Sequence, residues 1–311
     1  MDKRLILKSG LKRLDYKVCR VKRIISLFLA IFMITNIFAL EKNVKLNSRY
    51  EMPVLGLGTW TLTGETCEVA VYSALKDGYR LIDTAKYYGN EKEVGNGIAK
   101  AVKEGICKRE EVFITSKIVP WSSNPEKDIE DSLKQLGVEY IDLCLLHQSG
   151  GQISDDRVYK AMEKYAKAGK IRSIGISNSY TENAVNHFIK DFEIKPAVIQ
   201  NENHIYCQGT DLQKYCAKYG VFIESYYPFG GRGHTGENLN NPVIIKIAKA
   251  YGKTAAQIIV RWHLQSGFIA IPGSSNPAHI LENYSVWDFE LNDEEMKEIK
   301  AINRNKRYEN W

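Results

Sequence analysis

The sequence predicts an α/β protein whose eight strands close into a single (β/α)8 barrel, and three observations lead to this prediction. Short apolar runs alternate with amphipathic stretches from Val44 onward. The alternation repeats eight times over about 270 residues, a length typical of such barrels. The competing fold, a doubly wound sheet, normally carries a Gly-rich fingerprint after an early strand, and Gly56-Leu-Gly58 is not followed by a third glycine.

In the first half of the chain, each predicted strand is a short apolar run, separated from the next helix by a loop marked with Gly, Asn or Pro. The predicted strands are Val54–Gly58, Arg80–Asp83, Val112–Lys117 and Ile141–His147. They alternate with the predicted helices Glu65–Lys76, Glu91–Lys103, Pro125–Leu136 and Asp155–Ala168. The turn Asp77-Gly78 separates the first helix from the second strand.

The second half repeats this pattern, with a long loop after the seventh strand. The predicted strands are Ile171–Ser177, Ala197–Glu202, Val221–Tyr226 and Phe268–Ile271. The predicted helices are Glu182–Lys190, Asp211–Tyr219, Val243–Tyr251, Thr254–Gln265 and Pro277–Tyr284. Gly252-Lys253-Thr254 resembles the end of a phosphate-binding loop, but Ile247 occupies the place of its first glycine. We therefore interpret Thr254 as the cap of a helix.

The composition fits one large domain or two small ones, because 44% of the 311 residues are hydrophobic. The formal net charge of +6 comes from the N-terminus, where residues 1–40 hold nine Lys or Arg and only two Asp. The remaining 34 basic and 35 acidic residues nearly balance. The body of the protein therefore shows no sign of a nucleic-acid-binding surface.

Residues 1–43 are a predicted N-terminal extension to a barrel domain of residues 44–311. The uncharged segment Ile24–Leu40 fits a signal peptide with an imperfect cleavage site, or a membrane anchor whose N-terminus stays in the cytoplasm. A translation start nearer Met33 is a third interpretation. The six cysteines form no CxxC pair, which indicates a reducing compartment. We expect cytoplasmic catalysis, and residues 24–40 leave anchoring or export open.

Polar side chains end successive predicted strands, at the rim where (β/α)8 barrels build their active sites. Asp83 ends one strand, and Tyr88 lies five residues further on. Lys117 ends the apolar run VFITSK and needs a carboxylate partner when buried, for which Asp83 is the natural candidate. A cation beside a phenol lowers its pKa from about 10, so this arrangement predicts proton chemistry at Tyr88. His147 ends the run IDLCLLH at the same rim.

The remaining polar strand ends are Ser177, Asn178, Gln200 and Tyr226. Each of these residues alone has an ordinary structural explanation, such as a hydrogen-bonded core residue. Together, at one rim of one predicted barrel, they favour a functional site.

These motifs resemble the aldo-keto reductase family, in particular bacterial members similar to 2,5-diketo-gluconate reductase and prostaglandin F synthase. The resemblance covers nearly all of residues 44–311. It rests on segments in the family's order: MPVLGLGTW, GYRLIDTAKYYGNEKEVG, VFITSK, IDLCLLH, GKIRSIGISN, QNE, ESYYPFGGRG and IPGSSNPAHILEN. The resemblance implies the fold predicted above and an NAD(P)H-dependent carbonyl reductase.

The resemblance implies a catalytic tetrad of Asp83, Tyr88, Lys117 and His147. Tyr88 would be the general acid that protonates the carbonyl oxygen, and Lys117, held by Asp83, would stabilise the phenolate. His147 would orient and polarise the carbonyl. Tyr87 is the rival acid, but the five-residue spacing from Asp83 favours Tyr88.

The resemblance also implies a cofactor site along the same rim. Ser177, Asn178 and Gln200 would hold the nicotinamide carboxamide, and Tyr226 would stack on its ring. The loop after the seventh strand would bind phosphate through Phe229, Gly230 and the following residues. Its Arg232 either assists the pyrophosphate or is a solvated loop charge.

The segment after the eighth strand matches the part of the family that binds the adenosine side of the cofactor, and its residues are Ser274, Ser275, Asn276, His279, Glu282 and Asn283. On the substrate side, Trp60 and Trp121 are expected to wall an apolar pocket. The tail after Ala301 is expected to leave little chain to fold over that pocket.

The chain departs from the family at positions that bear on cofactor choice. Gly273 and His279 stand where the family often has a lysine and an arginine directed at the 2′-phosphate. Tyr227 replaces a frequent serine, and Ile199 a frequent asparagine. We therefore expect NADP(H) as the cofactor, with NAD(H) also used.

The leading functional hypothesis is reduction of small aldehydes, ketones or keto-sugars by a monomeric barrel. The alternative is a regulatory barrel that keeps the cofactor site and serves a membrane partner through residues 1–40. A metal-dependent hydrolase is rejected, because the six histidines form neither an HxH pair nor an HExxH motif.

Overall fold

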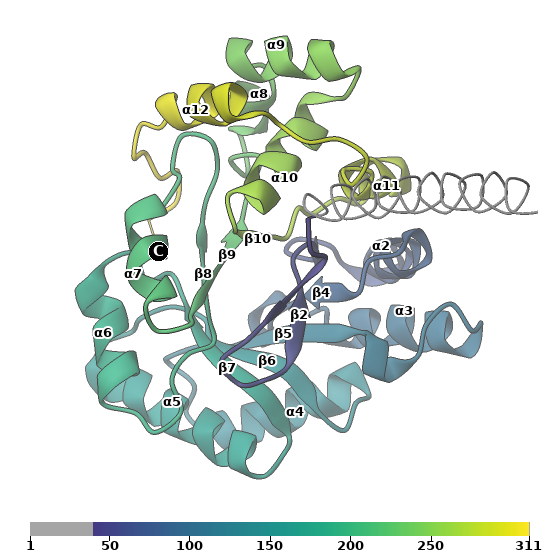
Figure 1. Cartoon of the computed structure of the whole chain (residues 1–311). Helices are drawn as coiled ribbons and strands as arrows, with labels where there is room; N and C mark the ends of the chain where they lie inside the picture. Colours follow the sequence, from purple (N-terminus) through teal and green to yellow (C-terminus); the bar gives the residue numbers. More distant parts are fainter. Residues whose placement is uncertain (1–39, 311) are drawn as a thin grey trace, which may run out of the picture. The chain divides into compact units, whose positions relative to one another are not determined.

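The computed structural model describes residues 40–310, and the described residues from Lys42 onward belong to one compact unit (Figure 1). Eight parallel strands form one sheet in the order β10-β9-β8-β7-β6-β5-β4-β3. The sheet closes on itself because Leu55 forms a parallel bridge with Ala270, and the N–H of Gly56 donates to the carbonyl of Ala270. The predicted (β/α)8 barrel is confirmed.

The eight barrel strands are short and almost entirely buried, as expected for a parallel sheet covered by helices. Their bounds are β3 Leu57–Gly58, β4 Leu81–Asp83, β5 Phe113–Ile118, β6 Ile141–Leu146, β7 Ile171–Ser177, β8 Val198–Glu202, β9 Phe222–Tyr226 and β10 Ile269–Ala270. The first predicted strand, Val54–Gly58, was too long, because only its last two residues pair with β4.

The helices around the barrel follow the predicted pattern closely (Figure 1). Their bounds are α2 Gly64–Asp77, α3 Glu91–Lys103, α4 Pro125–Leu136, α5 Gln152–Lys167, α6 Glu182–Lys190, α7 Thr210–Ala217, α9 Pro242–Tyr251, α10 Ala255–Gln265 and α11 Pro277–Tyr284. The predicted cap at Thr254 is confirmed, since its side chain accepts a hydrogen bond from the N–H of Gln257 in a capping box.

Within residues 40–310, two strands and two α-helices were not predicted. A hairpin of β1 Asn43–Lys45 and β2 Glu51–Pro53 precedes the barrel, and its Met52 packs in the same core cluster as residues of the barrel strands (Figure 1). Helix α8 Thr235–Leu239 lies in the long loop after β9, and α12 Asp293–Ala301 follows α11. Both strands of the hairpin are three residues long, too short to show a periodic pattern.

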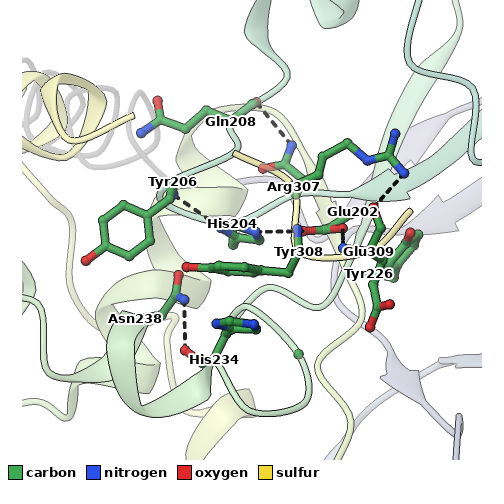
Figure 2. A network of polar contacts seen from close by, with 12 residues as sticks. Glu202, His204, Tyr206, Gln208, Tyr226, His234, Asn238, Arg307, Tyr308 and Glu309 are labelled. Atoms are coloured by element: carbon green, nitrogen blue, oxygen red, sulfur yellow. Dashed lines mark hydrogen bonds and ion pairs between the residues drawn. The ribbon is translucent and has the colours of Figure 1, made fainter. Parts of the chain in front are cut away.

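The C-terminal tail after α12 folds back onto residues that are far away in the sequence (Figure 2). The backbone N–H groups of Tyr308 and Glu309 donate to the two carboxylate oxygens of Glu202, at 2.6 and 3.0 Å. The ring of Tyr308 stacks between His204 and His234, with centroid distances of 4.6 and 3.7 Å. The tail therefore joins the end of β8 to the start of α8.

The N-terminal prediction largely lies outside the described residues, since only Leu40 of the segment 24–40 is described. The domain boundary after residue 43 therefore stays a prediction. Within residues 40–310, no helix has the length and apolar character needed to cross a membrane. The five cysteines in this range are all free thiols.

Candidate active site

The ends of β4 and β5 bring three of the predicted tetrad residues into one hydrogen-bonded line. Lys117 Nζ donates to Asp83 Oδ1 at 2.7 Å, to the carbonyl of Thr84 at 2.9 Å and to Tyr88 Oη at 3.0 Å. A single turn of 3-10 helix, η1 Lys86–Tyr88, follows β4 and directs Tyr88 back toward Lys117. The predicted partnership of Lys117 with Asp83 is therefore present.

The Asp83–Lys117 pair is buried, since Lys117 is 0% and Asp83 2% exposed. Burial by itself lowers the pKa of Lys117, but the charge of Asp83 and the hydrogen bonds to Asp83 and Tyr88 outweigh it and hold that pKa above its ordinary value. Burial raises the pKa of Asp83, while Lys117 and Gln200 oppose this rise. The ammonium group is thus a fixed positive charge beside the phenol.

The expected lowering of the Tyr88 pKa below 10 was wrong. Burial raises the pKa of Tyr88 to about 12, and the opposing effect of Lys117 is smaller than this desolvation. The charge of Asp83 adds to the rise. Tyr88 is therefore protonated at physiological pH, the state that a proton donor requires.

His147 follows β6 and lies beside Tyr88, with ring centroids 5.5 Å apart in an edge-to-face arrangement. Burial, with the charge of Lys117 in addition, lowers the pKa of His147 to about 3, so the imidazole is neutral. Its buried Nδ1 has no hydrogen-bond partner among residues 40–310. A neutral imidazole donates through one nitrogen only, so His147 can offer one N–H to a ligand.

Aromatic rings form a wall outside Tyr88. Trp60 lies against Tyr88 at a centroid distance of 4.6 Å and stacks on Tyr87 at 6.5 Å. Tyr87 in turn meets Trp121 edge to face at 6.0 Å. Tyr87 is 61% exposed, whereas the hydroxyl of Tyr88 accepts from Lys117 Nζ at 3.0 Å, so Tyr88 is the phenol beside the cation.

The predicted nicotinamide contacts Ser177 and Asn178 lie at the end of β7, next to Tyr226 on β9. Asn178 has φ +58, a left-handed conformation that asparagine tolerates better than most residues. Its amide nitrogen donates to the carbonyl of His147 at 3.0 Å and to Ser177 Oγ at 3.3 Å. Its Oδ1 accepts from the hydroxyls of Tyr226 at 2.7 Å and Tyr180 at 3.2 Å.

A cavity of about 670 Å³ opens at this rim, within the size range of small-molecule sites. Among its lining residues are all the tetrad side chains except the fully buried Lys117, and the predicted residues Trp60, Trp121, Ser177, Asn178, Gln200, Tyr226, Phe229, Arg232, Ser274 and Ser275. The cavity joins the expected substrate wall to the expected cofactor residues.

The other predicted cofactor residues are not in the cavity lining: Gly230, Asn276, His279, Glu282 and Asn283. Two of these side chains have structural contacts. Asn276 caps α11 by accepting from the N–H of Ala278, and Glu282 accepts from Thr254 Oγ1 at 2.6 Å. His279 is exposed on α11.

Comparisons with known proteins agree with this geometry. The model of the aldo/keto reductase family matches residues 54–304. The chain belongs to the aldo/keto reductase family. Glyoxal reductase of Bacillus subtilis is 40% identical over 275 residues, which span 86% of this chain and 95% of that protein. NAD(P)H-dependent D-xylose reductase I,II of Candida tropicalis is 38% identical over 305 residues, 85% of this chain and 93% of that protein.

Among solved structures, an aldo-keto reductase of Bombyx mori in complex with NADP superposes with a TM-score of 0.78 at 32% identity. That comparison covers 85% of this chain and 94% of the other. The fold of this aldo/keto reductase therefore agrees with that of a solved member of the family.

This aldo/keto reductase contains a further buried carboxyl group that the sequence reasoning missed. Glu224, on β9, is 0% exposed and lies opposite Gln200 in the register of β8 and β9. Gln200 Nε2 donates to Asp83 Oδ2 and to Glu224 Oε2, both at 2.7 Å. The sequence did carry a signal for this group, because Glu224 is a charged residue inside the apolar run VFIESY, just as Lys117 is in VFITSK.

Proposed function

We propose that this protein reduces the carbonyl group of small aldehydes, ketones or keto-sugars to an alcohol with NAD(P)H. The observation that carries the proposal is the line Asp83–Lys117–Tyr88, in which a buried cation lies 3.0 Å from a protonated phenol at a cavity. A proton donor with a fixed counter-charge suits reduction of a carbonyl, whose oxygen becomes negative as the carbon accepts a hydride.

The residues around the cavity fit a nicotinamide dinucleotide. Ser177 and Asn178 offer hydroxyl and amide groups beside the ring of Tyr226, as a carboxamide requires. At the far end, the loop after β9 has positive φ at Gly230 and Gly231, and Ser274 and Ser275 supply neutral donors. NAD(P)H bound there would supply the hydride.

The chain's own contribution is the proton. The Tyr88 hydroxyl donates its proton to the carbonyl oxygen, which leaves a phenolate. Lys117 stabilises that phenolate at 3.0 Å, and Asp83 fixes Lys117 from the opposite side at 2.7 Å. Because the Tyr88 pKa is about 12, the phenol keeps its proton until charge develops on the carbonyl oxygen.

His147 and the aromatic wall orient the substrate. The neutral imidazole of His147 can donate one N–H to the same carbonyl oxygen without adding a charge. Trp60, Tyr87 and Trp121 present ring faces and edges to the apolar part of the substrate. The relatives named for glyoxal and D-xylose support a small aldehyde or an open-chain sugar as substrate.

The test is NADPH oxidation by the purified protein with glyoxal, D-xylose and a small neutral ketone. Wild type should turn over at least one of them, and Tyr88→Phe should lower kcat by about 10²–10⁴-fold, since only the proton is removed. NADPH affinity, measured by fluorescence, should stay within about twofold, because the ring of Tyr88 still packs on Trp60.

Tyr87→Phe is the matched control, one residue away and also in the wall, and it should keep most of the activity. Full activity in Tyr88→Phe together with its loss in Tyr87→Phe would reassign the acid. No turnover of any carbonyl by wild type would argue against the proposed reaction.

A further inference from the structure

Glu224 lies in the interior of the barrel, and Gln200 connects it to Asp83 of the proposed catalytic line. Its side chain is fully buried, and its strand neighbours in register are Gln200 on β8 and Ile269 on β10. Glu224 is not one of the four tetrad residues, and it does not line the cavity. Its carboxyl group therefore needs an explanation of its own, since glutamate is rarely fully buried without a partner.

The amide of Gln200 connects Glu224 to the catalytic line. Both N–H bonds of that amide point to carboxyl oxygens, one on Glu224 and one on Asp83, each at 2.7 Å. The other oxygen of Asp83 accepts from Lys117, which in turn contacts Tyr88. An unbroken chain of hydrogen bonds thus leads from Glu224 to the phenol.

The charges along this chain do not balance when both carboxyl groups are ionised. The charged groups that reach Glu224 are Asp83 from β4 and Lys117 from β5, whereas β8 presents the neutral Gln200 and β10 the apolar Ile269. One ammonium group cannot compensate two buried carboxylates, and an uncompensated buried charge is costly. The second oxygen of Glu224 has no hydrogen-bond partner among residues 40–310, so a single hydrogen bond, from Gln200, favours its ionised form there.

The titration of Glu224 agrees with this geometry. Burial, with the charge of Asp83 in addition, raises its pKa to about 8, while Gln200 and Lys117 oppose the rise. This pKa lies close to physiological pH, so a small rise in pH favours the ionised form of Glu224. Tyr88, with a pKa of about 12, keeps its proton throughout this range.

We propose that Glu224 is a positioning residue of the reductase site. While Glu224 is a neutral acid, it does not compete with Asp83 and Tyr88 for the positive charge of Lys117. Its ionisation lowers kcat and so sets the upper pH limit of carbonyl reduction. This inference rests on the proposed function. When Glu224 loses its proton, the hydrogen-bonded chain carries a second negative charge, which interacts with the same ammonium group of Lys117. The phenolate left after proton transfer is then less stabilised, so carbonyl reduction slows.

The experiment compares kcat for a neutral aldehyde at saturating NADPH between pH 6 and 9.5, in wild type, Glu224→Gln and Glu224→Leu. Wild type should lose about tenfold in kcat across a single ionisation near pH 8, the effect of one added charge on the phenolate. Both variants should lack this limb, because neither side chain ionises. Glu139→Gln, at an exposed position, is the control and should keep it.

A second measurement reads the protonation of Glu224 without turnover. The infrared carbonyl band of a neutral carboxyl group should be present in wild type at pH 6, weaken by pH 9.5, and be missing from Glu224→Gln at both values. Glu224→Leu serves if Glu224→Gln does not fold, since an apolar replacement of a buried carboxyl group is often tolerated.

An alkaline limb that persists unchanged in both variants would overturn the proposal, and so would the absence of a titrating band assigned to Glu224. If the band titrates but the protein reduces no aldehyde, the proposed function is wrong. The ionisation of Glu224 would then stand, and only its effect on kcat would be overturned.

Discussion

The stacking of Tyr308 between two histidines predicts that one side chain holds the C-terminal tail in place (Figure 2). Each ring contact should contribute about 0.5–1.5 kcal/mol. The hydroxyl of Tyr308 also donates to Glu237 Oε2 at 2.9 Å, which should add about 0.5–1.5 kcal/mol at this exposed site. Tyr308→Ala should therefore favour opening of the tail by about 2–4 kcal/mol.

The assay is hydrogen exchange of the peptide that covers residues 304–310. The amides of Tyr308 and Glu309 are the ones bonded to Glu202, so their exchange reports tail opening directly. In Tyr308→Ala these amides should exchange faster by about two orders of magnitude. Tyr308→Phe keeps both ring contacts and should change exchange by no more than about tenfold. Equal exchange rates in wild type and Tyr308→Ala would refute this reasoning.

Two further predictions concern the catalytic line and the cofactor. Lys117→Met and Asp83→Asn should each lower kcat. Their effects on the activation free energy should be strongly non-additive in the double variant, because the two side chains contact each other at 2.7 Å. Additive effects in steady-state kinetics would contradict this coupling. His279 lies on the exposed face of α11. His279→Arg should raise the preference for NADPH over NADH, measured as the ratio of kcat/KM, by about 1–2 kcal/mol, because the arginine gains a charge-assisted contact with the 2′-phosphate. An unchanged ratio of kcat/KM would mean that the 2′-phosphate binds elsewhere.

Much of the fold could be predicted because its elements carry strong local patterns. Helices α3, α4, α6 and α11 have the bounds expected from apolar periodicity and turn residues. Helix α12 offered a comparable signal that was overlooked, since Asn292 and Glu295 form a capping box at its start. The β1–β2 hairpin offered none, because strands of three residues are too short for a period to appear.

In the candidate site too, some features could be predicted from the sequence and others could not. The contact of Lys117 with Asp83 was predictable, because a buried lysine needs a carboxylate and the neighbouring strand supplied one. The pKa of Tyr88 was not, because its direction depends on how much water the fold removes from the phenol. The tail contacts were equally hidden, since Tyr308 meets His204 and His234 only after folding brings distant segments together.

The hydrogen bonds of Asn178 affect how the site gains affinity for a ligand. Both donors and both lone pairs of its amide are already engaged, by His147, Ser177, Tyr180 and Tyr226. A ligand that bonds to this amide must therefore exchange partners with the protein, so the enthalpy of the new contact is largely offset by the one it replaces. Asn178 would then contribute to selectivity for the orientation of the ligand, and most of the binding free energy would come from the apolar surface that the ligand buries elsewhere in the cavity.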